Sequence, residues 1–346
     1  MESDQYIIAV DAMSGDYGLE VTVPAALNVL QRELNLHLIL VGDPDGLQKQ
    51  LSLHKSCKQD RLRIQPSSQV VAMDESPVQA LRTKKDSSMW LALNLIKQGE
   101  AQACVSAGNT GALMAMARFI LKTLPGVDRP AIVAMLPTMK ANTTVRVLDL
   151  GANVDSEVEH LFQFAVMGSV LAEAVDGIER PTVGLLNIGS EAIKGNKQVK
   201  ELAQLLLKTP SLNYVGYVEG DAIYQGVADI VVCDGFVGNI ALKVTEGVAK
   251  LINYSMRCAF QRNWLTRLSG LAASHVLQRV RKQIDPEHYN GASFLGLQGI
   301  VIKSHGGANS VAFEHAINKA ILEVQKNIPQ LIRKRVGALL QDHTAD

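Results

Sequence analysis

Five junctions in this chain share one pattern, in which an apolar run typical of a buried strand ends in small polar residues and glycine before a helical pattern. The junctions lie at residues 11–16, 106–111, 187–191, 234–239 and 304–309. This repeated order of strand, turn and helix is typical of an α/β fold with a mainly parallel sheet. If the strands are parallel, their carboxyl ends and all five junctions gather on one edge of the sheet.

The junction at 106–111 has the composition of an anion site. It joins the strand-like run 103–105 to the helical pattern 112–121. The first N–H groups of a helix have no intrahelical partner, and the helix dipole adds about half a positive charge there. Gly108 and Gly111 let a ligand approach the main chain. An ordinary capped turn is the alternative, but the repetition of the pattern favours ligand binding.

The length and the charge limit the class of protein. We expect a single domain over residues 1–346, with an α/β core at 6–245 and 292–340 and a helical excursion at 246–291. Lys and Arg together number 34, as do Asp and Glu, so no overall charge points to nucleic acid. The N-terminus is acidic, and no apolar run approaches the roughly 18 residues that cross a bilayer. We therefore predict a soluble, cytoplasmic protein.

The sequence contains no motif that indicates metal or nucleotide binding. The four cysteines have neither zinc nor disulfide spacing, which suits a reducing compartment; they are Cys57, Cys104, Cys233 and Cys258. The GxGxxG, P-loop, HExxH and GxSxG motifs are also absent. We expect no metal and no cofactor.

Two groups of lysines stand near predicted strand or helix ends. Lys84 and Lys85 precede a helix expected at 89–97, where cations beside a helix N-terminus suit phosphate or an acidic partner. Lys194 lies between a predicted strand end and Gly195, where it can contact an oxyanion. The alternatives are a solvated charged face for the first pair and an ordinary exposed lysine for Lys194.

Residues 247–284 differ in character from the rest of the chain. They contain no Asp or Glu and seven cations, namely Lys250, Arg257, Arg262, Arg267, Arg279, Arg281 and Lys282. Trp264, Leu265, Leu268 and Leu271 alternate with these cations in a helical pattern. Such a segment suits an anionic membrane surface or a partner protein, and a solvated basic hairpin is the alternative. We predict reversible, peripheral association with anionic membranes.

Seven motifs taken together resemble the bacterial acyl carrier protein:phosphate acyltransferase family. They lie at residues 11–13, 84–89, 106–112, 149–153, 194–196, 234–239 and 303–306. The resemblance runs from about Tyr6 to beyond Ala316. It implies a homodimer with a Rossmann-like α/β/α sandwich and a mainly parallel sheet, similar to phosphotransacetylase and isocitrate dehydrogenase folds, with a helical protrusion.

The same resemblance implies an activity. A long acyl group would pass from acyl carrier protein to inorganic phosphate, giving acyl phosphate for phospholipid synthesis. The partners would be acyl carrier protein, inorganic phosphate, the membrane surface and, as a further partner, the membrane glycerol-3-phosphate acyltransferase. Two alternatives remain: a phosphotransacetylase-type acyltransferase that uses coenzyme A thioesters, and a non-catalytic membrane scaffold for lipid-synthesis enzymes.

The reaction suits the residues at the strand ends. Phosphate is already an oxyanion and the leaving group is a thiolate, so neither a covalent nucleophile nor a strong acid is required. The site has to hold phosphate and thioester about 3 to 3.5 Å apart and stabilise the oxyanion that forms. The predicted catalytic residues are Lys194, Asn109, His305, Asn239 and Asp234. The predicted substrate- and phosphate-binding residues are Asp11, Ser106, Gly108, Thr110, Gly111, Lys84, Lys85, Asn153 and Asn196.

Individual roles follow as hypotheses. Lys194, Asn196 and the amides of 109–111 would bind phosphate. Asn239 and His305 would donate to the carbonyl oxygen.

Asp11 and Asp234 would orient these donors. The sequence departs from the family pattern at Ser14, where glycine is usual, at Leu19, where proline is usual, and at Ser190, where an acidic residue is common. We expect the Ser14 side chain to narrow the space through which a ligand reaches the backbone of this loop. The residues Thr22 to Pro24 predict the start of the first helix.

Overall fold

The structure is a computed structural model that describes residues 5–54, 60–141, 143–275 and 289–343. These residues form one sheet of 11 strands in the order β3-β2-β1-β4-β11-β10-β5-β6-β9-β7-β8. Most neighbouring pairs are parallel, as predicted. The strands are β1 (Tyr6–Asp11), β2 (Leu36–Gly42), β3 (Leu62–Pro66), β4 (Ala103–Ser106), β5 (Ala131–Pro137), β6 (Thr144–Leu148), β7 (Thr182–Leu186), β8 (Asn213–Val218), β9 (Ile230–Val232), β10 (Ala292–Leu295) and β11 (Ile300–Lys303).

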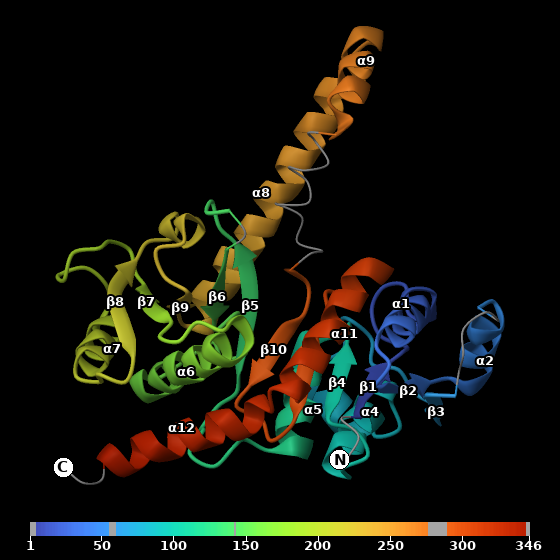
Figure 1. Ribbon diagram of the computed structural model, residues 1–346, viewed down its shortest axis with the longest axis horizontal. Helices are drawn as coiled ribbons and strands as arrows, with labels where there is room; N and C mark the ends of the chain where they lie inside the picture. The colour runs from blue at the N-terminus through green and yellow to red at the C-terminus, as the bar shows by residue number, and fades with distance from the viewer. Residues whose placement is uncertain (1–4, 55–59, 142, 276–288, 344–346) are drawn as a thin grey trace.

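Helices cover both faces of the sheet (Figure 1). One face carries a hydrophobic cluster under α4 and α5, and the other carries two clusters, one under α1, α2 and α11 and one under α6, α7 and α12. This confirms the α/β/α sandwich. The helices are α1 (Leu19–Arg32), α2 (Pro44–Ser52), α3 (Pro77–Thr83), α4 (Ser88–Lys97), α5 (Thr110–Leu121), α6 (Val158–Leu171), α7 (Lys197–Leu207), α8 (Gly235–Gln261), α9 (Trp264–Ala272), α11 (Ser310–Gln325) and α12 (Ile328–His343), with short turns η1 (Ala172–Asp176) and η2 (Ala222–Gln225).

The sheet reverses direction in its middle. β10 is antiparallel to both β11 and β5, and β5 is antiparallel to β6. Because there are three antiparallel pairs between β11 and β6, the strands on the two sides of the sheet run in opposite directions. The strands β6, β9, β7 and β8 therefore run opposite to β1, β4 and β11. The expectation that all five junctions gather on one edge is therefore wrong. The junctions after β1, β4 and β11 lie together, whereas those after β7 and β9 follow strands of the other direction.

The first helix begins earlier than predicted. α1 starts at Leu19, so Pro24 lies inside it rather than near its first residue. Pro24 removes one hydrogen bond close to the start of α1, where little preceding helix meets its ring. The Thr22 hydroxyl, expected to cap the helix, instead donates to the carbonyl oxygen of Ala12 at 2.7 Å. Thr22 thus ties α1 to the loop that follows β1.

One helical stretch contradicts the expectation about apolar runs. Val158–Asp176, which is α6 with its π-helical turn η1, is 19 residues long and has a mean hydropathy of 1.2, enough to cross a membrane by length and composition. In the structure 72% of its apolar 18-residue window is buried within the protein. Phe162, Phe164 and Met167 lie in the hydrophobic cluster between α6 and the sheet, as predicted. The stretch therefore has the surroundings of a core helix.

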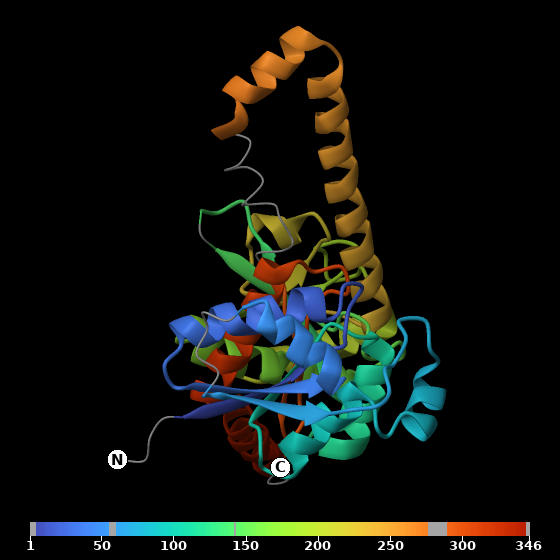
Figure 2. The ribbon, with the colours of Figure 1, turned by 90° about the vertical axis from the view of Figure 1, so that its right-hand side faces the viewer.

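The predicted helical protrusion is present. α8 is 27 residues long and rises out of the body, and α9 folds back beside its far end (Figure 2). α8 continues unbroken through the boundary expected at residue 245. Trp264, Leu265, Leu268 and Leu271 are all exposed. Residues 276–288, which include the last three predicted cations, lie outside the described part of the chain.

Candidate active site

The loops after β1, β4 and β11 are joined into one cluster, which we call the β4 cluster. The amide of Ser304 donates to the carbonyl oxygen of Ser106 at 2.8 Å, and the amide of Asp16 donates to the carbonyl oxygen of Gly306 at 2.9 Å. A Cβ on Gly15, which has φ +85°, would come within 3.0 Å of both Ala107 and Gly306. The three loops are therefore in direct contact, as expected for parallel neighbours in the sheet.

Asp11 and Ser106 form the buried base of the β4 cluster. The Ser106 hydroxyl donates to Oδ2 of Asp11 at 2.6 Å and accepts from the amide of Gly108 at 3.1 Å. Their exposed fractions are 1% and 0%. Burial raises the pKa of Asp11, although the Ser106 hydrogen bond opposes this shift. Oδ1 of Asp11 is buried and has no hydrogen-bond partner. Both side chains are closed off by protein atoms and act on a ligand through the turn that they hold.

Ser14 has a structural role that the sequence did not predict. Its hydroxyl donates to the carbonyl oxygen of Asp11 at 2.6 Å and accepts from the amide of Ala107 at 2.8 Å. Positive φ falls on the following Gly15, so the turn does not need glycine at residue 14. The side chain fastens two loops of the β4 cluster together.

The N-terminus of α5 is the exposed part of this cluster. Asn109 caps the helix by accepting from the amide of Ala112 at 3.0 Å. Its amide group also donates to the carbonyl oxygens of Met73 and Glu75, both at 2.9 Å. These bonds commit both ends of the side chain to the protein, so Asn109 holds the turn in shape.

Thr110 and Gly111, the first two residues of α5, are both exposed. Helix geometry leaves their amides without intrahelical partners. The N-terminal end of the helix dipole favours negative charge at these amides. These two amides are therefore available to an anion, and the predicted binding role of Thr110 and Gly111 stays a prediction.

His305 places an exposed imidazole beside these loops. Its backbone amide donates to Oδ1 of Asn290 at 2.8 Å, and its Nδ1 accepts from the amide of Gly307 at 3.1 Å. Burial lowers the pKa of His305, with Glu246 opposing and Lys243 reinforcing the shift. A neutral ring whose Nδ1 accepts carries its proton on Nε2. His305 can therefore offer an N–H donor to a ligand.

Lys303 and Lys243 were not among the predicted site residues. Lys303 ends β11 directly opposite Ser106, and its ammonium donates to the carbonyl oxygens of Ala107 and Ser304. Lys243, on α8, acts electrostatically on both Lys303 and His305. The sequence signal for Lys303 was its place at the end of an apolar strand and before a glycine junction, whereas Lys243, inside α8, left no such signal.

Lys84 and Lys85 lie on the segment between α3 and α4. Lys84 approaches Glu75 at 3.8 Å between Nζ and Oε2, and Glu75 accepts from Asn109 through its carbonyl oxygen. Lys85 is exposed. Ser87 caps α4 by accepting from the amide of Trp90 at 3.2 Å, as predicted for this segment. Lys84 is thus connected to the β4 cluster through Glu75.

The junctions after β6 and β9 form a second group, which we call the β6 cluster. Its centre is Asp149, which is 0% exposed. Asp149 accepts from the amides of Ile132, Ala152 and Asn153 at 3.0, 3.0 and 2.8 Å, and from the Asn153 side chain at 2.9 Å. Burial raises the pKa of Asp149 against these hydrogen bonds. Asn153 also donates to Pro130, so its predicted binding role competes with structural bonds.

α8 begins tightly packed in the β6 cluster. Asp234 caps it by accepting from the amide of Phe236 at 2.9 Å and also accepts from the amide of Ser156 at 3.0 Å. A Cβ on Gly238 would lie 1.9 Å from the carbonyl oxygen of Asp149. Glycine is thus required where the first turn of α8 meets the loop after β6.

Three predicted residues are exposed around the β6 cluster. Lys194 lies in the loop after β7, where its carbonyl oxygen accepts from the Asn187 side chain at 3.3 Å. Asn196 caps α7 by accepting from the amide of Val199 at 2.9 Å. Asn239 lies on the second turn of α8 beside Gly151. The structure places these residues with Asp149 rather than with Ser106.

α8 is the element that connects the two clusters. Asn239, Lys243 and Glu246 are spaced by one helical turn and share a face of α8. Asn239 lies beside the β6 cluster, while Lys243 and Glu246 act electrostatically on His305 in the β4 cluster. α8 therefore runs from the predicted residues Asp234 and Asn239 towards the predicted residue His305.

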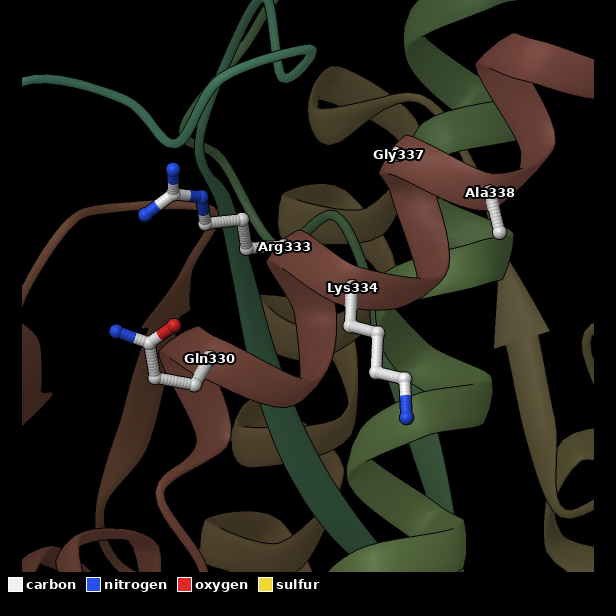
Figure 3. Close-up of a pocket in the computed structure, with 5 residues that line it drawn as sticks. All are labelled: Gln330, Arg333, Lys334, Gly337 and Ala338. Carbon is white, nitrogen blue, oxygen red and sulfur yellow. The ribbon is translucent and has the colours of Figure 1, made fainter.

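A hollow on α12 lies apart from both clusters. It is lined by Gln330, Arg333, Lys334, Gly337 and Ala338, all on one helix (Figure 3). None of the predicted site residues belongs to it. Among the described residues, no group of three or more His, Cys, Asp or Glu side chains is close enough to hold a metal ion.

Solved structures share this fold. The chain superposes on a phosphotransacetylase from Streptococcus pyogenes with a TM-score of 0.62 and 18% identity, covering 93% of this chain and 94% of that one. A branched-chain phosphotransacylase from Enterococcus faecalis V583 gives a TM-score of 0.57 at 14% identity, with coverages of 92% and 99%. The chain therefore shares its fold with the phosphotransacetylases.

Sequence relatives identify the family. Residues 6–331 match the family described as fatty acid synthesis protein. The chain is 59% identical over 338 residues to the phosphate acyltransferase of Alkalilimnicola ehrlichii, covering 98% of each chain. It is 58% identical over 335 residues to that of Nitrosococcus oceani, covering 97% of this chain and 98% of that one. The chain belongs to the phosphate acyltransferase family, and it is an acyltransferase of fatty acid and phospholipid synthesis. The non-catalytic scaffold is thereby set aside.

Proposed function

We propose that the chain transfers a long acyl group from acyl carrier protein to inorganic phosphate, releasing acyl phosphate and the free carrier thiol. The observation that carries the proposal is the β4 cluster, in which the free amides of Thr110 and Gly111 lie at a helix N-terminus within the cluster that contains His305. Amides of this kind bind phosphate, and the Nε2–H of His305 is a donor suited to a thioester oxygen.

In the proposed reaction a phosphate oxygen attacks the thioester carbonyl carbon directly. A C–O bond forms, the C–S bond breaks, and the electron pair leaves on sulfur as a thiolate. Preorganised donors stabilise the oxyanion between these events. Asn239 and His305 are the proposed donors to that oxygen, and Lys194, Asn196, Lys84 and Lys85 add donors and positive charge for phosphate.

No protein nucleophile takes part in this proposal. Ser106 is fully buried and already donates to Asp11. Cys104 and Cys233 are buried, and burial raises the pKa of each thiol, which disfavours the reactive thiolate. Mass spectrometry after rapid quench tests the point, because an acyl group attached to any side chain during turnover would contradict direct attack.

The carrier preference separates this proposal from its alternative. Purified protein is mixed with phosphate and either palmitoyl acyl carrier protein or palmitoyl coenzyme A, and acyl phosphate is trapped with hydroxylamine. We expect phosphate-dependent product with the carrier protein thioester. Turnover of coenzyme A thioester alone would favour the phosphotransacetylase-type activity, for which the shared fold is the supporting observation.

We further propose a homodimer in which α8 contacts a second copy. An exposed apolar stripe runs along α8 with helical spacing, consisting of Val237, Ile240, Val244, Val248 and Leu251. One apolar face on an exposed helix favours burial against a partner. Sedimentation of the purified protein tests this, since a monomer at micromolar concentration would contradict the proposal.

Peripheral membrane association at the cytoplasmic face completes the proposal, because the acyl phosphate product would be delivered to the membrane glycerol-3-phosphate acyltransferase. The far end of the protrusion combines exposed Leu268 and Leu271 with exposed cations. Each leucine would contribute roughly 1.5 to 3 kcal/mol when fully buried in lipid. Flotation with anionic liposomes should weaken in the double variant Leu268→Glu, Leu271→Glu. Leu207→Glu, an exposed site on the body, is the control, and equal flotation of all three proteins would refute the assignment.

A further inference from the structure

Lys303 occupies an unusual position for a lysine. It ends β11, pairs in register with Ser106 of β4, and is 8% exposed. Its Nζ donates to the carbonyl oxygen of Ala107 at 3.3 Å and to that of Ser304. One side chain therefore holds the turn after β4 and the turn after β11 together from inside the β4 cluster.

This arrangement is costly for stability. No carboxylate among the described residues forms a salt bridge with Lys303, and two backbone carbonyls solvate an ammonium less well than water does. Lys303→Met would remove this cost, because burying an ammonium outside an ion pair is unfavourable. A buried charge that does not serve stability points to a functional role at this position.

The contacts of Lys303 lead to the anion-binding surface. Ala107, whose carbonyl oxygen it holds, is followed by Gly108, whose amide donates to Ser106, and two residues later α5 begins with its free amides. Ser304, whose carbonyl oxygen it also holds, precedes His305. We propose that Lys303 is a positioning residue for the phosphate acyltransferase reaction, which fixes the α5 N-terminus and His305 relative to each other and places a positive charge behind the bound phosphate. This inference rests on the proposed function.

Four charged groups from the surrounding elements act with Lys303. They are Asp11 of β1, Asp16 of the following loop, Lys243 of α8 and His305. Burial, and then Lys243, lower the pKa of Lys303 from 10.5 to about 8, against the opposing effect of the two aspartates. The ammonium is therefore present below about pH 8 and is lost as the pH rises through that value, so activity that depends on it falls there.

The stability effect has the opposite direction. Between the folded pKa of about 8 and the unfolded value of 10.5, the unfolded chain binds more protons. Stability therefore rises with pH across this interval. If Lys303 had only a structural role, its removal would lower stability. If Lys303 is a positioning residue, its removal can leave the fold intact.

The experiment compares Lys303→Met and Lys303→Arg with the parent and with Lys208→Met, an exposed lysine at the end of α7. Initial rates are measured with phosphate as the varied substrate from neutral to alkaline pH, and each protein is melted. We expect Lys303→Met to lose about 100-fold in kcat/KM for phosphate, mainly through KM, because small misplacements of reacting groups cost that much. It should melt at or above the parent temperature.

The other variants make the result specific. Lys303→Arg keeps a permanent charge, so it should retain part of the activity and lose the fall near pH 8. Lys208→Met should match the parent throughout. Unchanged kcat/KM in Lys303→Met, or a loss that only follows a lower melting temperature, would overturn the inference. A parent protein without phosphate-dependent thioester cleavage would overturn the proposed function itself, whereas an active parent with equally active Lys303→Met overturns this inference alone.

Discussion

The β4 and β6 clusters contain the same elements, but they differ in how completely the carboxylate of their buried aspartate is hydrogen-bonded. Each has a buried aspartate at the end of a strand, a short loop and the start of a helix. Asp149 accepts four hydrogen bonds from its own surroundings. Asp11 accepts one at Oδ2 and leaves Oδ1 without a partner. The Asp149 carboxylate is therefore saturated by its own loop, whereas the β4 cluster has a buried carboxylate oxygen without a partner and offers a ligand the exposed residues Thr110 and Gly111.

The difference follows from what each cluster has to hold. In the β6 cluster, Gly235 and Gly238 bring the first turn of α8 against the backbone of the loop after β6, so the loop needs a fixed shape. In the β4 cluster, α5 is capped by Asn109 and its first amides face outwards. The same strand-to-helix motif thus supports either a long helix or an anion, depending on whether a neighbour fills the space beside the amides.

The largest expected effect is a loss of stability when one methyl group is added to the β6 cluster. In Gly238→Ala the new Cβ would lie 1.9 Å from the carbonyl oxygen of Asp149, so backbone has to move. We expect a loss of about 4 kcal/mol or more in the free energy of unfolding, measured by denaturant titration. In the matched variant Gly108→Ala the new Cβ would lie 2.5 Å from the flexible end of Met89 and 3.2 Å from Oγ of Ser106, so side chains rather than backbone have to move. A Gly238→Ala protein as stable as Gly108→Ala would remove the distinction between the clusters.

The next effect concerns activity. His305→Ala should lower kcat roughly 100- to 1000-fold, as removal of one preorganised oxyanion donor does, while the melting temperature stays near that of the parent. The same measurement on Lys194→Ala asks whether the β6 cluster also contributes to the reaction. A similar loss there would show that α8 joins both clusters into one site, and near-parent activity at saturating phosphate would remove Lys194 from it.

The two aspartates should respond differently to the same change. In Asp149→Asn an amide group faces N–H donors, which should cost about 2 to 3 kcal/mol of unfolding free energy. Asp11→Asn should cost less, because the Ser106 hydroxyl can rotate and accept from the new amide. Chemical denaturation of both variants at neutral pH measures the difference. Equal losses of unfolding free energy in the two variants would mean that the unpaired Oδ1 of Asp11 does not distinguish the two clusters.

The smallest effect is expected at Asn109. The sequence alone predicted that Asn109 is a catalytic residue. The cap on Ala112 and the bonds to Met73 and Glu75 instead predict that Asn109→Ala loses about 1 to 2 kcal/mol of unfolding free energy. Asn109→Asp keeps the cap acceptor and serves as the control. If Asn109→Ala melted with the parent yet lost activity, the direct catalytic role would stand and the positioning role would fall.

Much of the fold was determined locally and could be read from the sequence. The five junctions predicted the carboxyl ends of β1, β4, β7, β9 and β11 closely, and α4 begins one residue before the helix expected at 89–97. Helix capping depends on side chains within three residues, so it leaves a visible mark in the chain. The resemblance of seven motifs to the phosphate acyltransferases was likewise confirmed by the relatives.

What only the tertiary structure decided was how these local pieces meet. Strand direction depends on long-range pairing, and the antiparallel pair of β5 and β6 reverses the strands beyond it, which divided the predicted site into two clusters. The burial of Lys303 and the saturation of Asp149 depend on atoms from β1, β4, β5 and α8 that no sequence window contains. Local propensity fixes the elements because its interactions span a few residues, whereas the unmet hydrogen-bonding capacity that marks a site exists only after distant segments have packed together.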